Sequence, residues 1–351
     1  MPVADYLRAV PKVELHVHLE GAIQPATLLT LAKRNGITLP ATTEPELRDW
    51  FRFRDFPHFA EIYITITRCL RAVDDYELIA YEFGAEMARQ HVRYAEVTFS
   101  PSTHRALGVS DETMIDGLTN GRLRAREEFG VEMAWVFDIV RWITDDDTFR
   151  KADYTTELAI ACRDQGVVAL GLGGVEQGHP PEPFEPYFDR ARVAGLHSAP
   201  HAGEHGGPES VRGAVERLGA ERIGHGVRAI EDPAVVALLA ARRIPIEVSP
   251  TSNVCLGVYP DLGAHPFRRL REAGVVATVN SDDPPLFNTT MNDEVALLPT
   301  AFGYDVGQID EILLDAVRVS FLPDDRKARL ESEFRAEMAA LRAAHLGTND
   351  L

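Results

Sequence analysis

Residues 13–18 read Val-Glu-Leu-His-Val-His, a short β-rich run that is followed at once by Leu19, Glu20 and Gly21. Seven further short runs recur along the chain, and stretches with helical spacing and charged faces lie between them. The seven runs are Val92–Ser100, Met133–Val140, Val167–Gly173, Leu196–His201, Arg222–Val227, Pro245–Ser249 and Val275–Asn280. Strand alternating with helix eight times predicts parallel βα units that close into a (β/α)8 TIM barrel. A doubly wound open sheet with the same strands is the alternative that this pattern leaves open.

The segments between the runs predict the helices. Thr113–Phe129 spaces its apolar residues as a helix does, and Pro233–Ala241 follows Asp232, which is a suitable N-cap residue. The interval between the first two runs is too long for one crossover helix. Extra helices are therefore expected after the first strand, at Gln24–Asn35, Pro45–Phe51 and Phe56–Ala72. The tail, residues 308–345, predicts two more helices that are separated at Pro323.

Length and composition fit one large barrel. The chain has 351 residues, of which 45% are hydrophobic and 26% charged, so it can bury a substantial core. No change of composition marks a boundary, and a single barrel domain is expected over residues 1–351. The net charge of −18 argues against a nucleic acid partner.

The chain shows no sign of a membrane or secreted protein. Its longest apolar run, Ala234–Ala241, has eight residues, whereas a membrane span needs about 20. The N-terminus resembles no signal peptide. Cys69, Cys162 and Cys255 form no C-x-x-C pair and are typical of reduced thiols. A cytoplasmic protein is expected, which could form a homo-oligomer.

Several strand ends carry side chains suited to bind a metal. His16 and His18 lie two apart on a strand, so both imidazoles point to one face. His201 and Asp282 follow two other strands, and the C-terminal ends of barrel strands meet around one site. Three imidazoles and one carboxylate suit Zn²⁺, one ion per chain, although iron and manganese remain alternatives.

Three neighbouring residues could act on a water that the metal activates or on the substrate. His225 could accept or orient the proton of that water, and Glu204, three residues after His201, could protonate the electrophile. Asp283 points away from Asp282 along a strand and is left for the substrate. Alone, these two aspartates are typical of a turn or cap, and Glu204 of an exposed loop. The prediction depends on the four strand ends acting together.

Five ordered motifs resemble a known family. They are Pro11-Lys-Val-Glu-Leu-His-Val-His-Leu-Glu-Gly21, His201-Ala-Gly-Glu204, Arg222-Ile-Gly-His-Gly226, Ser249-Pro-Thr-Ser-Asn253 and Asn280-Ser-Asp-Asp-Pro284. Together they resemble the adenosine/adenine deaminase family of the amidohydrolase superfamily, over nearly the whole chain. The resemblance implies a barrel with one zinc ion held by His16, His18, His201 and Asp282.

The resemblance also implies roles around a purine. Glu204 would protonate N1, His225 would act as the base, Gly174 would donate its backbone N–H to N3, and Asp283 would face N7. Water would add at C6 and ammonia would leave, giving a 6-oxopurine. Adenosine deaminases commonly have aspartate, which meets the ribose 5′-hydroxyl, where this chain has Glu20. Glu20 is therefore expected to meet the sugar, and His18 is expected to contact the substrate as well as the metal.

The sequence leaves the substrate open. Residues 284–290 are closer to nucleoside-type members, which favours adenosine or a derivative such as 6-aminodeoxyfutalosine, a menaquinone precursor. Adenine deaminase, acting on the free base, is the alternative. A non-catalytic zinc-binding barrel would not need Glu204 and His225. A two-metal amidohydrolase would usually need a lysine near the end of the fourth strand, and Val167–Glu176 contains none.

Overall fold

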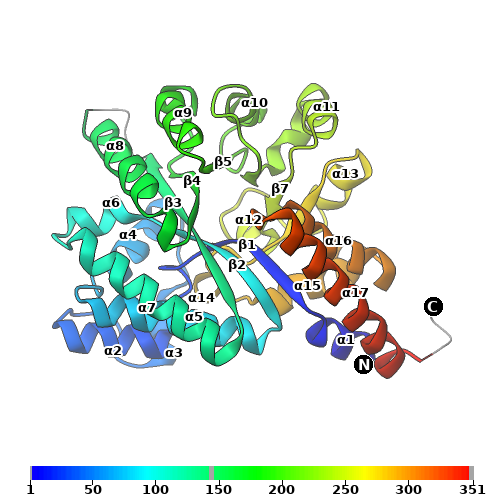
Figure 1. Cartoon of the computed structure of the whole chain (residues 1–351), viewed down its shortest axis with the longest axis horizontal. Helices are drawn as coiled ribbons and strands as arrows, with labels where there is room; N and C mark the ends of the chain where they lie inside the picture. Colours follow the sequence, from blue (N-terminus) through cyan, green and yellow to red (C-terminus); the bar gives the residue numbers. More distant parts are fainter. Residues whose placement is uncertain (1, 142–145, 348–351) are drawn as a thin grey trace.

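The computed structural model describes residues 2–141 and 146–347, in which eight parallel strands follow one another in chain order around a barrel (Figure 1). The strands are β1 (Lys12–His18), β2 (Val92–Phe99), β3 (Glu132–Arg141), β4 (Val167–Gly174), β5 (His197–Ala202), β6 (Ile223–His225), β7 (Ile246–Val248) and β8 (Ala277–Val279). Each strand overlaps one of the eight predicted runs, so the predicted succession of eight strands is confirmed.

The barrel closes between β1 and the residues that follow β8. The backbone N–H of His18 donates to the carbonyl of Asp282 at 2.9 Å, and the N–H of Asp282 donates to the carbonyl of His16 at 3.0 Å. Val17 and Asp282 form the parallel bridge between these segments. The open doubly wound sheet is therefore excluded, and the predicted closed barrel is confirmed. The same closure brings Asp282 beside both histidines of β1.

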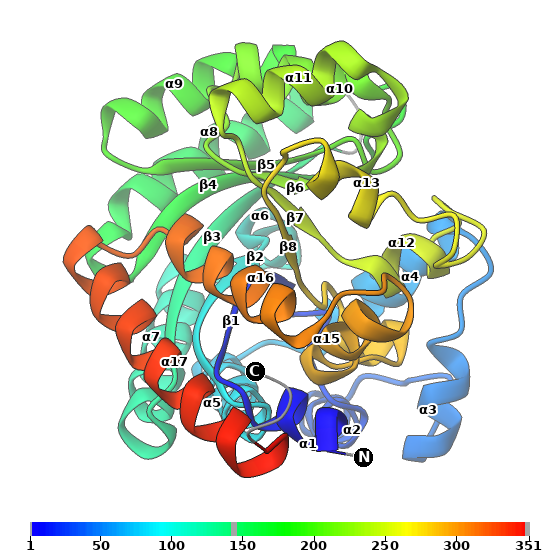
Figure 2. The ribbon, with the colours of Figure 1, turned by 90° about the vertical axis from the view of Figure 1, so that its right-hand side faces the viewer.

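Helices surround the strands, as Figures 1 and 2 show. They are α1 (Pro2–Ala9), α2 (Pro25–Asn35), α3 (Glu44–Trp50), α4 (Phe56–Thr67), α5 (Val73–Arg89), α6 (Pro101–Ala106), α7 (Asp111–Phe129), α8 (Asp146–Ala161), α9 (Glu185–Val193), α10 (Pro208–Glu216), α11 (Pro233–Arg242), α12 (Pro250–Cys255), α13 (Phe267–Glu272), α14 (Pro284–Phe287), α15 (Met291–Thr300), α16 (Val306–Val319) and α17 (Asp324–His345). The predicted extra helices after β1 and at the C-terminus are present.

Between β1 and β2, one helix was not predicted, and one predicted helix was too long. The expected helix Phe56–Ala72 ends at Thr67, and a further helix, α5, begins at Val73 and packs against α7. Asp75 explains the new start, because its carboxylate accepts the backbone N–H groups of Arg71 and Ala72, each at 3.0 Å. This contact satisfies the backbone donor of the N-cap residue Ala72 and that of the residue before it.

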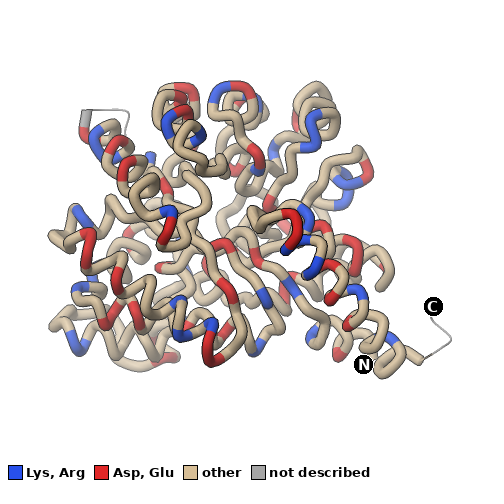
Figure 3. The backbone as a smooth tube through the Cα atoms, in the orientation of Figure 1, with Lys and Arg blue, Asp and Glu red and all other residues tan. Residues whose placement is uncertain are grey.

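The C-terminal helices fasten the outside of the barrel near β1. Helix α16 contacts β1 and β8, and α17 lies against α16 and α1 (Figure 2). The Tyr6 hydroxyl donates to Asp310 at 2.7 Å, and Arg342 pairs with the same carboxylate. Lys and Arg are interspersed with Asp and Glu along the outer helices (Figure 3). No helix within residues 2–141 and 146–347 is long and apolar enough to cross a membrane.

Candidate active site

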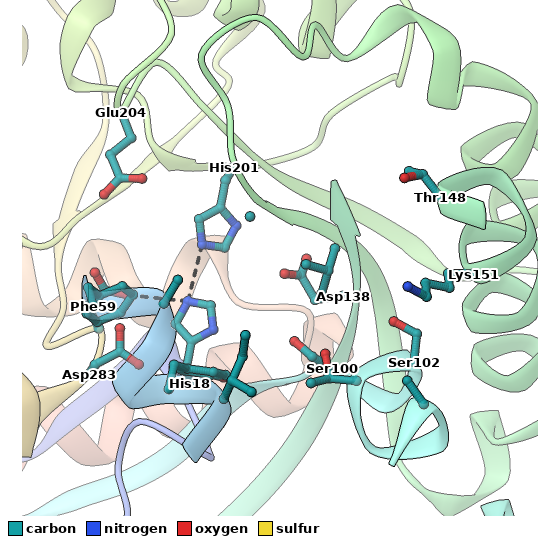
Figure 4. Close-up of a pocket in the computed structure, with 18 of the residues that line it drawn as sticks. His18, Phe59, Ser100, Ser102, Asp138, Thr148, Lys151, His201, Glu204 and Asp283 are labelled. Carbon is teal, nitrogen blue, oxygen red and sulfur yellow. Dashed lines mark hydrogen bonds and ion pairs between the residues drawn. The ribbon is translucent and has the colours of Figure 1, made fainter. Parts of the chain in front are cut away.

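The four predicted metal ligands converge at the C-terminal end of the barrel. His18 Nε2 lies 3.2 Å from His201 Nε2 and 3.3 Å from Asp282 Oδ1. His16 Nε2 lies 3.5 Å from the same Asp282 oxygen. All four residues are nearly buried within the barrel mouth, and His18 and His201 face each other in Figure 4.

This spacing fits a tetrahedral ion. With metal–ligand distances of about 2.0–2.1 Å, the ligand atoms around a tetrahedral centre lie roughly 3.3–3.4 Å apart. The three measured separations lie around that value. His16 Nε2 is buried without a hydrogen bond to any described residue, as expected of a nitrogen reserved for a metal. Three groups of possible ligands overlap in this cluster, and two of them also include His225.

Acidic neighbours raise the pKa of two imidazoles in the cluster, His16 and His18. Burial by itself lowers the pKa of His16, but the carboxylates of Asp282 and Glu247 outweigh it and raise the pKa to about 10. The same competition, with Asp283 as the largest opposing charge, raises the pKa of His18 to about 9. A divalent ion would displace the protons from His16 and His18, because a histidine must be neutral to bind a metal.

Three buried charged side chains orient His16 through its second ring nitrogen, Nδ1. Its Nδ1 lies 2.9 Å from Glu247 Oε2, and Arg222 Nε donates to the other Glu247 oxygen at 2.6 Å. Arg222 also pairs with Glu96, and none of these side chains is more than 3% exposed. A carboxylate on the second ring nitrogen fixes which nitrogen of His16 is free to bind a metal.

Two of the predicted site residues have left-handed backbone. The φ angle is +65° at Asp282 and +59° at His225. Such a conformation costs about 1–3 kcal/mol outside glycine and is found where the surrounding structure imposes it. At Asp282 the turn follows the bridge to β1, and its Oδ2 accepts the Ser252 hydroxyl at 2.5 Å.

His225 and Glu204 lie beside the metal-ligand cluster. His225 Nε2 is 3.7 Å from Glu204 Oε1 and 3.9 Å from Asp282 Oδ2. Its Nδ1 lies 3.1 Å from the Asn253 amide, whose oxygen is 3.0 Å from His265 Nε2. Burial lowers the pKa of His225, so its imidazole is neutral and able to accept a proton.

Glu176 fixes the loop that carries Glu204. Its Oε2 accepts the backbone N–H groups of Glu204 at 3.0 Å and of His205 and Gly206 at 2.8 Å, while Oε1 accepts Gly203 N–H at 2.5 Å. A single carboxylate thus gathers four amides and sets the direction in which the Glu204 side chain leaves the loop.

A cavity of about 340 Å³ opens over these residues. The catalytic candidates Glu204 and His225 line it together with Asp283 and Gly174. Gly174 has φ +82°, a conformation that favours glycine, and a Cβ there would lie 2.6 Å from a backbone oxygen. The remaining wall is mostly apolar and comes from α4, α6 and α8.

Comparison with known proteins identifies the family. The sequence pattern of the adenosine deaminase family matches residues 11–337. The chain belongs to the adenosine deaminase family. Aminodeoxyfutalosine deaminase of Streptomyces avermitilis is 40% identical over 338 residues, 96% of this chain and 93% of that protein. Adenine deaminase of Rhodospirillum rubrum is 38% identical, over 94% of this chain and 98% of that protein.

Solved structures of the same type superimpose closely. Adenine deaminase from Arthrobacter aurescens gives a TM-score of 0.84 at 33% identity, covering 93% of this chain and 99% of that one. An amidohydrolase from Burkholderia ambifaria with bound Zn gives 0.90 at 27% identity, covering 98% and 95%. This adenosine deaminase family member is therefore a hydrolase acting on C–N bonds, from a metal-dependent group of enzymes.

Glu20, which aligns with the family's sugar-binding aspartate, is not part of the cavity wall. Its side chain is fully buried; Oε1 lies 3.1 Å from the Ser100 N–H and 3.0 Å from His104 Nε2. The Tyr63 hydroxyl donates to Oε2 at 3.1 Å. The expectation that Glu20 meets the sugar is therefore not met here. The carboxylate instead holds the end of β2 against α4.

Other residues of the site were missed by sequence reasoning. Glu247 and Glu96 stand as isolated charges inside apolar strands, which is a usable signal for a buried ion pair. The sequence motifs include neither His104 nor His265, but both are buried in hydrogen-bonded networks of this adenosine deaminase family member. Asp138 on β3 also lines the cavity and was not predicted.

Proposed function

We propose that this protein is a zinc-dependent hydrolytic deaminase that converts the 6-amino group of a purine nucleoside to 6-oxo. The observation that carries the proposal is the placement of Glu204 and His225 beside a four-ligand cluster, at the closed end of one cavity. His16, His18, His201 and Asp282 would hold a divalent ion, and that ion would lower the pKa of a water bound at a further position toward 7.

Glu204 is suited to carry a proton from water to the purine. Burial raises the pKa of its carboxyl, but His225 and His205 outweigh burial and the pKa is lowered. Glu204 therefore starts ionised, takes one proton from the attacking water and delivers it to N1 as the water oxygen bonds to C6. The second water proton leaves with the amino group as ammonia, through the neutral His225, and C6 becomes a carbonyl.

Asp283 and Gly174 would hold the base on its other edges. Burial and the neighbouring Asp282 charge raise the pKa of Asp283, which favours the protonated carboxyl that would be needed to donate to N7, an acceptor. Gly21 leaves room for it, because a Cβ there would lie 1.6 Å from Asp283 Oδ1. The Gly174 N–H would meet N3.

The cavity favours a nucleoside over the free base. Beyond the histidines it continues past Asp138 to Ser102, Thr148 and Lys151, on the side away from Glu204 (Figure 4). A purine held between Glu204 and Asp283 leaves this part for a substituent on N9. Adenosine and aminodeoxyfutalosine are therefore the proposed substrates, and free adenine is the alternative that the 38% identical adenine deaminase favours.

A substrate panel tests the proposal. Protein loaded with zinc is assayed for ammonia release with adenine, adenosine, 5′-methylthioadenosine and aminodeoxyfutalosine. We expect one equivalent of zinc per chain and higher kcat/KM for at least one nucleoside than for adenine. Faster turnover of adenine than of every nucleoside would establish the free-base alternative. No turnover of any of the four would refute the 6-aminopurine deaminase.

A further inference from the structure

Asp138 is a buried carboxylate in the cavity wall that the chemistry described above does not use. It lies on β3, is 2% exposed, and stands between His18 and the Lys151 end of the cavity (Figure 4). Its Oδ1 has no hydrogen-bond partner among residues 2–141 and 146–347. Burying a carboxylate oxygen without a donor costs several kcal/mol, so an unsatisfied acceptor at a cavity wall points to a ligand that brings the donor.

The neighbouring residues that the structure describes leave space for the Asp138 carboxylate but donate no hydrogen bond to its Oδ1. Arg141, three residues along the same strand, donates instead to the carbonyls of His201 at 2.8 Å and His179 at 3.3 Å. On the adjacent strand, glycines leave space for the carboxylate. A Cβ at Gly171 would lie 2.5 Å from Asp138 Oδ1, and one at Gly173 would lie 2.1 Å from Oδ2. Both close approaches are possible only because these residues have no side chain.

We propose that Asp138 binds the sugar of the substrate, accepting hydrogen bonds from ribose hydroxyl groups, and that it thereby selects nucleosides over the free base. The inference rests on the proposed function, which places C6 at the histidines and the base between Glu204 and Asp283. In that placement the N9 substituent extends toward the Lys151 end of the cavity, past Asp138.

The chemistry of the group agrees with a hydroxyl ligand. An ionised carboxylate only accepts hydrogen bonds, and ribose offers hydroxyl donors. Glu20, which the sequence offered for this task, already has protein partners at both oxygens. Among the described carboxylates that line the cavity, Asp138 and Asp283 each have a fully buried oxygen without a hydrogen-bond partner, and Asp283 lies at the opposite side of the site (Figure 4).

The test is the substitution Asp138→Asn, measured with adenine, adenosine, 2′-deoxyadenosine and 3′-deoxyadenosine. The amide keeps the size of the side chain but loses the charge and one acceptor. We expect kcat/KM for adenosine to fall by about tenfold or more, and that for adenine to change by less than about threefold. For the deoxynucleoside that lacks the bonded hydroxyl, Asp138→Asn should cause little further loss of kcat/KM. The substitution and the missing hydroxyl remove the same interaction.

A second variant and a control separate binding from folding. Gly171→Ala leaves Asp138 in place but displaces its carboxylate, and should reproduce the nucleoside-selective loss. Glu294→Gln neutralises another buried acid, outside the cavity, and should leave the adenosine-to-adenine ratio unchanged. Equal losses for adenine and adenosine with Asp138→Asn, or a larger loss for adenine through its N9–H, would overturn the proposal while leaving the deaminase intact. Wild-type protein inactive on all four compounds would instead remove the proposed function itself.

Discussion

Replacing Glu247 by glutamine should weaken metal binding without removing a metal ligand. Glu247 accepts from His16 Nδ1 at 2.9 Å and from Arg222 Nε at 2.6 Å, one bond to each oxygen. A glutamine has the same size but only one oxygen, so its NH₂ group must face one of the two donors. Either His16 loses its orienting acceptor, or Arg222 loses one of its two buried carboxylates.

The size of the effect follows from the role of such partners. Removing the carboxylate behind a ligating histidine costs about 10- to 100-fold in metal affinity, equivalent to roughly 1.4–2.7 kcal/mol. We expect about a 10-fold loss of zinc affinity if the glutamine oxygen faces His16, and about a 100-fold loss if the NH₂ group faces His16. Zinc affinity is measured by competition with a chromophoric chelator, and kcat/KM is measured in zinc-buffered solution.

A matched control is available at the surface. Glu221 pairs with His197 Nδ1 at 2.8 Å, but both side chains are at least 40% exposed and lie outside the cavity. Glu221→Gln should leave zinc affinity unchanged, since exposed pairs contribute little. The free energy of unfolding of the zinc-free proteins measures separately any loss of stability from the weakened contact between Arg222 and residue 247. Zinc affinity of Glu247→Gln within about threefold of wild type would refute the reasoning that Glu247 orients His16.

The remaining predictions concern proton transfer and stability. Glu204→Gln should retain zinc by metal analysis but lose about 10²–10⁴-fold in kcat, because an amide cannot deliver the N1 proton; near-normal turnover would contradict this role. Asn253→Ala removes the partner of His225 Nδ1, and up to about tenfold loss in kcat with unchanged zinc content is expected. Burial raises the pKa of Glu294 to about 7, so this acid stabilises the fold below about pH 4.5 and the contribution is lost as pH rises through 7. Glu294→Gln should therefore flatten the wild-type decline in unfolding free energy between about pH 5 and 8, by at most about 3 kcal/mol, in denaturant titrations.

The strand ends could be predicted because their chemistry is local. The two-residue spacing of His16 and His18 is enough to place both on one face, and barrel topology gathers His201 with them. The failure at Glu20 has the opposite cause. β1 ends at His18, so strand alternation no longer governs the next residues, and the side chain folds back toward Ser100.

Partners from distant strands could not be read from the sequence. Glu247 meets His16, 231 residues away, only through the register of the closed barrel. Asp138 appeared in the sequence as one polar residue in an apolar run. What distinguishes it is the space left by Gly171 and Gly173 on the neighbouring strand, which depends on how β3 and β4 align. Side-chain types predict which chemistry is possible, whereas register decides which side chains meet.

The distribution of carboxylates separates the reaction from the choice of substrate. Asp282 and Glu204 lie against histidines, which lower the pKa of both, and they belong to the part of the site formed by β1, β5, β6 and β8. Asp138 lies on β3, and burial raises its pKa to about 7, outweighing the opposite effects of His18 and Arg141. A relative named for aminodeoxyfutalosine and one named for adenine match this chain at 40% and 38% identity, so overall similarity does not separate them. The difference must then come from local features away from the reacting carbon, and the side of the cavity around Asp138 is where a change would alter the fit of the N9 substituent.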